Sequence, residues 1–260
     1  MMIKYGYNKG IFDETGLKIP IQLDLSEHCN LLLTGCSGSG KSYALLFLIG
    51  SVLKSENEIE IYFCDFKNSY DFSFLEEYEN YYAGNNCYDG IMQYYKNFCL
   101  ARENRNFTKK HLLICDEYPA LVNYLQGQDK LNKTKYGNEV LSAISELLCL
   151  GRGINFYTWI VTQRADNTLF ANGSRDNFMV IIGLGRLSKE QKGMVFSGEE
   201  VPDTIYQKGE GVLLADGHPL LEVKFPLIKN VDDWKRHILE ILRSIRREYY
   251  RRMNTQQKNN

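Results

Sequence analysis

Short apolar runs alternate with longer segments of helical periodicity along most of the chain. Buried strands are predicted from the apolar runs at residues 30–34, 59–64, 112–115, 154–162 and 178–183, and a late β pair is predicted near 211–225. Helices are predicted at residues 43–53, 86–106 and 138–150. Because strands alternate with helices, we predict an α/β fold with a mainly parallel central sheet flanked by helices.

Three segments depart from this alternation. Residues 1–28 predict short strands joined by turns at Tyr7–Gly10 and Glu14–Gly16, with a half-buried edge strand over Ile19–Leu25. The polar stretch 126–137 predicts a loop. Near the C-terminus, apolar residues recur at helical spacing, namely Ile238, Leu239, Leu242, Ile245 and Tyr249, and five arginines lie between 243 and 252. We therefore expect one folded body over 1–228, with 1–28 as its N-terminal β segment, and, over 229–260, a basic amphipathic helix (231–252) with a frayed end from residue 254.

Charge and cysteine content limit the possible partners and location. The net charge of −1 provides no global basic field, so any contact with nucleic acid has to be local. No apolar run approaches the ~18–20 residues that span a bilayer. The seven cysteines form no C-x-x-C pair, which favours thiols in a reducing cytosol over a disulfide framework or a zinc site. We expect a cytoplasmic protein whose membrane contact, if any, comes from a partner.

The segment Gly35–Ser42 matches the pattern G-x-x-x-x-G-K-S, with a predicted strand before it and a helix after it. Glycines let the backbone wrap so that its amides, together with the positive helix end, face a phosphate. Such a loop binds ATP with Mg²⁺; Lys41 would bridge the β- and γ-phosphates, and the Ser42 hydroxyl would bind the metal. The predicted nucleotide-binding residues are Gly35, Cys36, Ser37, Gly38, Ser39, Gly40, Lys41 and Ser42. A chance Gly/Ser turn is the alternative, and Cys36 is either an oxidation-sensitive position or a tolerated small residue.

Two further strand ends carry polar residues with a role beside ATP. The run 112–115 leads to Asp116, predicted to bind nucleotide and Mg²⁺, and to Glu117, predicted to act as general base on the attacking water. The strand 154–162 leads to Gln163, which either contacts the γ-phosphate or is an ordinary polar strand end.

Taken in order, these motifs resemble the FtsK/SpoIIIE branch of the FtsK–HerA ATPases. The resemblance covers roughly residues 3–228 and is carried by LLLTGCSGSGKS, IYFCDFK, HLLICDEYPAL and LLCLGRGINFYTWIVTQR, together with the Gly209–Gly211 turn. It implies a RecA-like P-loop NTPase domain, a homo-oligomer in the form of a hexameric ring, and ATP-driven movement of double-stranded DNA. Lys41 and Ser42 would serve nucleotide and Mg²⁺, Asp116 and Glu117 would form the Walker B pair, and Gln163 would be the γ-phosphate sensor.

The resemblance also implies residues that act between subunits and on DNA. In such rings an arginine from the neighbouring subunit completes the site; Arg152 is the first candidate and Arg186 the second. The channel-facing segments here carry the candidate DNA contacts Lys130, Lys133, Lys135, Arg164 and Arg175. Such contacts would be nonspecific and salt-sensitive. Surface arginines and solvated loop charges are the alternatives.

Some positions depart from the family pattern. Ala165 stands where a proline usually follows T-Q-R, and Gly185-Arg186-Leu187-Ser188 replaces the usual D-S-R. Neither a membrane anchor nor a DNA-reading winged helix is evident. The prediction is therefore a short, stand-alone DNA translocase of a mobile element, serving conjugation, a plasmid or a phage. The alternatives are a secretion ATPase of the same fold, type VII or type IV coupling-like, or a nucleotide-gated scaffold that is not a motor. The C-terminal helix could dock a partner through its apolar stripe, pack on a neighbour or touch DNA.

Overall fold

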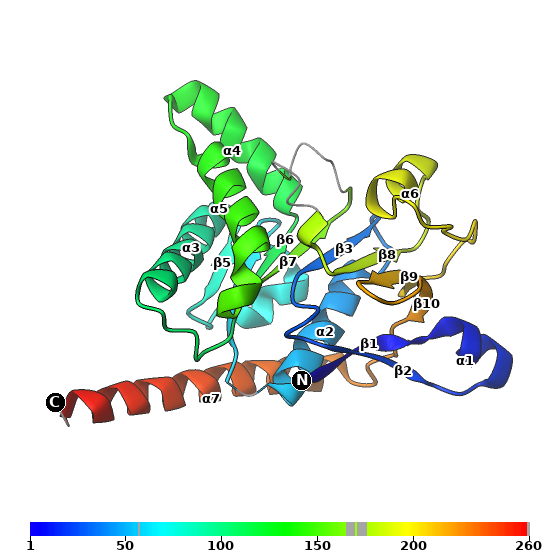
Figure 1. Ribbon diagram of the computed structural model, residues 1–260, viewed down its shortest axis with the longest axis horizontal. Helices are drawn as coiled ribbons and strands as arrows, with labels where there is room; N and C mark the ends of the chain where they lie inside the picture. The colour runs from blue at the N-terminus through cyan, green and yellow to red at the C-terminus, as the bar shows by residue number, and fades with distance from the viewer. Residues whose placement is uncertain (57, 165–169, 171–175, 259–260) are drawn as a thin grey trace.

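Within the part of the chain that the structure describes, ten strands form one sheet through the middle of the molecule, with helices on both of its faces (Figure 1). The computed structural model describes residues 1–56, 58–164, 170 and 176–258. The strand order is β2-β1-β10-β9-β8-β3-β7-β6-β4-β5. The predicted α/β class with a mainly parallel sheet is confirmed, although the sheet also has an antiparallel part.

Six strands form the parallel part: β3 (Leu31–Gly35), β4 (Glu60–Asp65), β5 (Tyr81–Ala83), β6 (His111–Asp116), β7 (Phe156–Thr162) and β8 (Val180–Leu184). Each pairs in parallel with its neighbour. All residues of β3 and β7 are buried, as expected for strands that have helices on both faces.

Four strands extend the sheet in antiparallel fashion beyond β8: β1 (Met2–Asn8), β2 (Pro20–Asp24), β9 (Glu210–Ala215) and β10 (Leu221–Lys224). The expected edge strand is β2, in which Ile21 and Leu23 are buried while Pro20 and Gln22 are exposed. The predicted β pair near 211–225 is the hairpin β9–β10.

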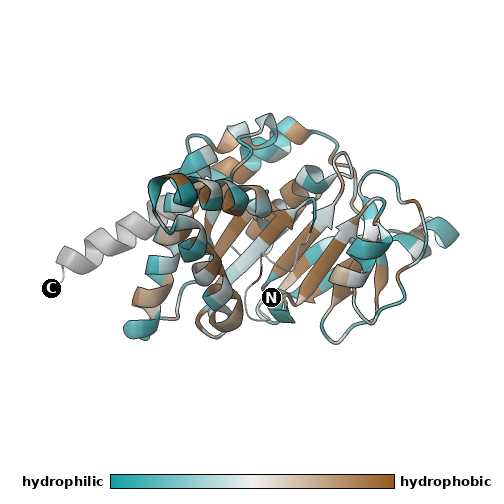
Figure 2. Ribbon diagram, turned by 90° about the horizontal axis from the view of Figure 1, so that it is seen from above, coloured by the Kyte–Doolittle hydropathy of each residue, from teal (hydrophilic) through white to brown (hydrophobic). Residues whose placement is uncertain are grey.

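Successive residues of the parallel strands contribute to two separate hydrophobic cores, one on each face of the sheet. Leu31 and Leu33 of β3 belong to one core, and Leu32 belongs to the other. The first core is covered by α2 (Lys41–Ser55) and α7 (Val231–Lys258), the second by α3 (Cys87–Glu103), α4 (Tyr118–Asn132) and α5 (Tyr136–Leu150). Figure 2 shows the apolar strands between these helical layers. The shorter elements are α1 (Lys9–Thr15), α6 (Lys189–Val195), η1 (Tyr70–Leu75), η2 (Gly84–Asn86) and η3 (Gly151–Ile154).

The turn predicted at Tyr7–Gly10 is wrong, because helix α1 begins there. The Asn8 side chain accepts a hydrogen bond from the Ile11 backbone amide (3.0 Å), which makes Asn8 an N-cap rather than a turn residue. Gly16 closes the helix in the left-handed conformation, so the expected second turn is the helix C-cap.

The loop predicted over residues 126–137 is also largely wrong, since α4 continues to Asn132. Tyr118, Leu121, Val122 and Leu125 bury one side of α4, and the polar end follows as the exposed tip of an α4–α5 hairpin. The Asp129 carboxylate then accepts hydrogen bonds from the first amides of α5, at Tyr136 (2.9 Å) and Gly137 (2.8 Å). Polarity at the hairpin tip reflects exposure rather than loop structure.

The predicted C-terminal helix is α7, and its apolar stripe packs on the body of the protein. Ile238 and Leu242 are buried in the same core as α2. The helix continues to Lys258, whereas fraying was expected from residue 254 onward. No described helix combines the length and the apolar character that a membrane span requires.

Candidate nucleotide site

The predicted site residues follow the carboxyl ends of neighbouring parallel strands, which meet at one edge of the sheet. The register places Asp65 beside Asp116 and Asp116 beside Val161, while Thr34 lies beside Thr162. A cavity of about 300 Å³ opens at this edge. It is lined by Ser37, Gly38, Gly40, Lys41, Ser42, Tyr43, Leu46, Lys67, Ser69, Asp71, Asp116, Glu117, Gln163, Lys208, Val231 and Lys235.

The loop from Gly35 to Gly40 leads into α2 and leaves the first amides of that helix without a side-chain cap. Uncapped helix amides are donors for an anion. Gly40 has φ +99°, and a Cβ atom there would lie 2.8 Å from the Gly209 nitrogen, which itself donates to the Ser39 carbonyl (2.8 Å). Only glycine fits between the loop and the Gly209 turn, so the loop can present its amides to a phosphate.

The Lys41 ammonium lies within this loop. Its side chain is buried, and Nζ donates to the carbonyl oxygens of Gly35 (2.7 Å) and Cys36 (3.1 Å). Burial lowers the pKa of Lys41, while the nearby Glu117 and Asp116 carboxylates act in the opposite direction. A partly desolvated cation beside uncapped amides fits the phosphate groups of a nucleotide.

Two buried carboxylates stand side by side at the ends of β4 and β6. Burial, with Asp65 and Glu117 close by, raises the pKa of Asp116 to about 7. Burial also raises the pKa of Asp65, whose Oδ2 accepts from the Ser69 amide (2.9 Å) and the Tyr81 hydroxyl (3.2 Å) while Oδ1 has no hydrogen-bond partner. Two adjacent buried carboxylates repel each other when both are ionised, and a divalent cation bound beside them would reduce that repulsion.

The predicted metal ligands fit Mg²⁺ by the chemistry of their donors. The Ser42 hydroxyl and the Asp116 carboxylate both line the cavity and are hard oxygen ligands. The described residues contain no cluster of three or more His, Cys, Asp or Glu side chains suited to a metal. Magnesium in phosphate-transfer sites needs none, since it binds through one or two protein oxygens plus phosphates and water.

Glu117 and Gln163 are brought into direct contact. Gln163 Nε2 donates to Glu117 Oε1 (2.8 Å), and the Gln163 carbonyl in turn accepts from Gln191 Nε2 (3.0 Å). Glu117 itself adopts the left-handed conformation, φ 56° and ψ 39°, which a non-glycine residue rarely occupies. The backbone is thus strained at the residue predicted to be the general base.

Eight further cavity residues were not predicted as site residues. Tyr43 and Leu46 lie on α2 directly after the phosphate loop, and the other six lie elsewhere in the chain. Lys67 stood within the quoted IYFCDFK motif but carried no predicted role; Ser69 and Asp71 follow it. Lys208, Val231 and Lys235 come from the other end of the chain, more than 160 residues after the phosphate loop. No local pattern marks these three, because only packing brings them to the cavity.

Neither candidate arginine lines the cavity, and both are exposed. Arg152 lies in η3, directly before β7, and therefore at the opposite edge of the sheet from the cavity. Arg186 follows β8 at the cavity edge; its neighbour Gly185 lies against Ser39 and Cys36 of the phosphate loop.

The candidate DNA contacts lie in two separate places. Lys130, Lys133 and Lys135 are exposed around the tip of the α4–α5 hairpin, which projects from the body in Figure 1. Arg164 is exposed next to Gln163. Arg175 lies outside the described residues.

Comparison with known proteins relates this chain to ATPases. The sequence model of the FtsK/SpoIIIE family matches residues 4–106. The FtsK domain-containing protein YdcQ of Bacillus subtilis (strain 168) is 28% identical over 196 residues, which are 69% of this chain and 38% of YdcQ. The chain thus spans under two fifths of the length of this curated relative.

Solved structures share the fold at low identity. The conjugation coupling protein TcpA of pCW3, solved as a monomer with ATPγS, has a TM-score of 0.67 at 19% identity, covering 93% of this chain and 70% of TcpA. ATPases 2 and 3 of EssC from Geobacillus thermodenitrificans give a TM-score of 0.68 at 11% identity, covering 96% of this chain and 49% of that one. The cytoplasmic domain of the type VII secretion ATPase EccC from Thermomonospora curvata gives 0.65 at 16% identity, covering 91% and 31%. The fold is therefore that of the RecA-like P-loop ATPases.

Proposed function

We propose, from the premise that this chain belongs to the FtsK/SpoIIIE branch of the P-loop ATPases, that it hydrolyses ATP in the cavity at the carboxyl edge of its parallel strands. One observation carries the proposal: Lys41, Asp116 and the Glu117–Gln163 pair, which come from three separate strand ends, line a single cavity. No one of these motifs is specific alone, but their convergence is what phosphoryl transfer requires.

The roles assigned to the residues follow from their chemistry. The amides of the phosphate loop and the Lys41 ammonium bind the phosphate chain of ATP. Bound Mg²⁺, held by Ser42 and Asp116, would neutralise charge that develops on the transferred phosphoryl group. Glu117 accepts a proton from the water that attacks the γ-phosphorus, and the bond to the ADP oxygen breaks. The Gln163 amide holds the Glu117 carboxylate and contacts the γ-phosphate.

We further propose that hydrolysis drives double-stranded DNA through a homo-oligomeric ring of six chains, in a mobile element. The support is the family and the fold, since TcpA is a conjugation coupling protein. In this ring Arg152, or else Arg186, enters the neighbour's cavity in a head-to-tail arrangement. The lysines of the α4–α5 hairpin (Lys130, Lys133 and Lys135) together with Arg164 and Arg175 contact the DNA backbone. Location in the cytosol, with membrane recruitment by a partner, stays a prediction.

A second candidate is a secretion ATPase that moves protein. It is favoured by the fold similarity to EssC and to EccC, which is a type VII secretion ATPase. A nucleotide-gated scaffold is less well supported, because Lys41, Asp116, Glu117 and Gln163 all carry the functional groups that hydrolysis needs.

The experiment is ATP turnover by the purified chain, with and without long duplex DNA at low salt, alongside Lys41→Ala. Hydrolysis that DNA stimulates and that Lys41→Ala abolishes is the expected result. Hydrolysis without stimulation, combined with binding to a secretion substrate, would transfer the proposal to the protein-moving alternative. Nucleotide binding without turnover would favour the scaffold.

A further inference from the structure

The first two turns of α7 form part of the wall of the nucleotide cavity. Val231 and Lys235, one helical turn apart, line the same cavity as Lys41 and Asp116. The start of α7 is capped by Asn230, whose side-chain oxygen accepts from the Asp233 amide (3.1 Å). The position of Lys235 is therefore set by an ordered helix terminus rather than by a free tail.

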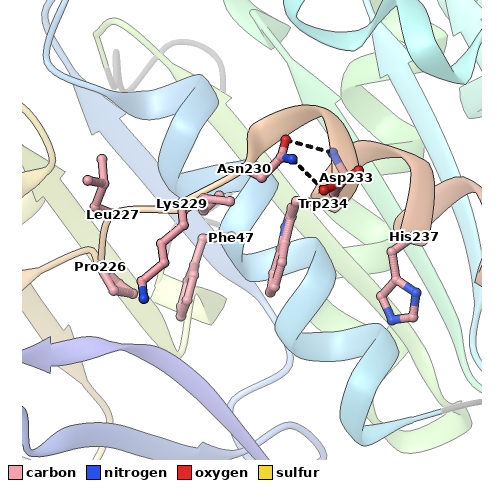
Figure 3. Close-up of a pocket in the computed structure, with 9 residues that line it drawn as sticks. Phe47, Pro226, Leu227, Lys229, Asn230, Asp233, Trp234 and His237 are labelled. Atoms are coloured by element: carbon pink, nitrogen blue, oxygen red, sulfur yellow. Dashed lines mark hydrogen bonds between the residues drawn. The ribbon is translucent and has the colours of Figure 1, made fainter.

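Trp234 fastens this part of α7 to α2, the helix that begins at Lys41. Its indole Nε1 donates to the Leu46 carbonyl (3.0 Å), and its rings lie parallel to Phe47, as Figure 3 shows. Lys54, also on α2, places its ammonium nitrogen 4.0 Å from the centre of the Trp234 ring. At Gly50 a Cβ atom would lie only 2.3 Å from the indole, so the absent side chain is what admits Trp234.

The Lys235 ammonium faces aromatic rings rather than carboxylates. Its Nζ lies 5.8 Å from the Tyr70 ring centre and 5.4 Å from that of Phe74, both in η1. Among the described residues, no carboxylate lies within ion-pair distance of it. The Lys235 side chain is half-buried on the cavity wall. A partly buried ammonium group without a carboxylate partner is suited to bind an anionic ligand.

The charges that line the cavity indicate which anion Lys235 would bind. The lining contains the four lysines Lys41, Lys67, Lys208 and Lys235 and the three acids Asp71, Asp116 and Glu117. Magnesium-bound ATP is a net anion at neutral pH, so the four lysines would attract it to the cavity.

We infer that Lys235 binds the phosphate chain of the nucleotide directly, so that α7 is a component of the nucleotide site. The inference rests on the proposed ATP site and adds to it a ligand from a helix that lies outside the family match. Because Trp234 joins α7 to α2, the phosphate loop and Lys235 act as one unit.

The test is calorimetric binding of a non-hydrolysable ATP analogue with Mg²⁺ to the full chain and to Lys235→Ala, Lys235→Arg and Arg236→Ala. We expect Lys235→Ala to weaken binding about three- to tenfold, as for a half-exposed charge pair, and Lys235→Arg to restore it. Arg236→Ala is the matched control, since it removes a neighbouring α7 charge that does not line the cavity. Affinity for adenosine, measured by competition, should be unchanged.

Gly50→Ala gives an independent test, because the new methyl group displaces Trp234 and with it Lys235. We expect it to weaken analogue binding, and the double variant Gly50→Ala/Lys235→Ala to bind no more weakly than Gly50→Ala alone.

The outcomes separate this inference from the ATP site itself. If the parent chain binds the analogue, Lys41→Ala abolishes binding and Lys235→Ala binds like Arg236→Ala, only the role of Lys235 is overturned. A loss of adenosine affinity equal to the loss of analogue affinity also overturns it, since α7 would then only shape the cavity. If the parent chain binds no nucleotide, the ATP site and this inference fall together.

Discussion

The amide nitrogen of Gln163 donates a 2.8 Å hydrogen bond to the carboxylate of Glu117, 46 residues earlier in the chain. The contact joins the loops after β6 and β7 at the mouth of the nucleotide cavity. It holds the predicted general base in place and gives Gln163 a route to influence catalysis that does not require contact with ATP.

Glu117→Gln should lower ATP turnover by about 10²–10⁴-fold, because an amide cannot take a proton from the attacking water. Gln163→Ala should lower it less, since the base remains but is no longer held. Glu117→Gln should bind ATP within about twofold of the parent chain, because Glu117 acts on the attacking water, whereas Gln163→Ala also loses the proposed contact with the γ-phosphate and should bind ATP more weakly. Turnover and calorimetric affinity are the measurements; unchanged turnover in Glu117→Gln would support the scaffold alternative.

The left-handed backbone of Glu117 leads to a prediction on stability. Glu117→Gly should eliminate turnover yet raise the free energy of unfolding by up to about 1 kcal/mol, because glycine occupies this conformation without strain. Denaturant unfolding checks it. Arg105→Gly is the matched control, as Arg105 also has a positive φ (51°) but is exposed and does not line the cavity. A less stable Glu117→Gly would mean that contacts of the side chain outweigh the strain.

Asp116 should make the stability of the nucleotide-free protein depend on pH. Its pKa is raised from 3.8 to about 7, so the folded state keeps a proton that the unfolded state has already lost. Stability should therefore be greatest below about pH 4 for this group, fall as the pH rises, and level off above about pH 7. The groups facing it are Asp65, Glu117, Lys41 and Lys67.

Asp116→Asn should flatten this dependence and raise the free energy of unfolding at pH 8 by about 1–3 kcal/mol, because it removes a buried charge. The measurement is thermal or denaturant unfolding between pH 4 and 8, without nucleotide or Mg²⁺. Asp71→Asn, at an exposed acid of the same cavity, is the control and should leave the profile as it was. A parent profile that stays flat between pH 4 and 8 would contradict the prediction.

Arg152 should act on the neighbouring subunit's nucleotide, because it lies at the sheet edge opposite its own cavity. Arg152→Ala should lower turnover about 10³-fold or more without loss of ATP affinity. Mixing it with Lys41→Ala should restore part of the activity, since each chain supplies what the other lacks. Arg186→Ala, treated identically, is the comparison; recovery only with Arg186→Ala would assign the role to that residue.

The lysines at the tip of the α4–α5 hairpin should bind DNA without regard to sequence. The triple variant Lys130→Ala, Lys133→Ala and Lys135→Ala should reduce the stimulation of turnover by duplex DNA and make the remaining stimulation less sensitive to salt. Turnover without DNA should not change. Lys4→Ala, which removes one exposed lysine on β1 away from the hairpin, is the control. Equal stimulation in both variants would remove the hairpin from the DNA path.

Much of the fold could be predicted because its signals are local. The apolar runs of β3, β4, β6 and β7 are long enough to require burial on both faces, and each leads into a polar residue at the same sheet edge. The errors were also local. Asn8 is compatible with either a turn or a helix N-cap. The polar end of α4 resembles a loop in sequence because it is exposed at the tip of a helical hairpin.

The sequence by itself determined the phosphate loop and its strand–helix context, because eight contiguous residues contain the turn chemistry and the cation that a phosphate needs. Only the tertiary structure decided which distant side chains complete the cavity. Lys235 reaches it because Gly50 leaves room for Trp234, and the pKa of Asp116 is raised by its burial and by Asp65 beside it on the neighbouring strand. Contacts of this kind depend on packing between elements far apart in the chain, and no periodicity or motif within one segment encodes them.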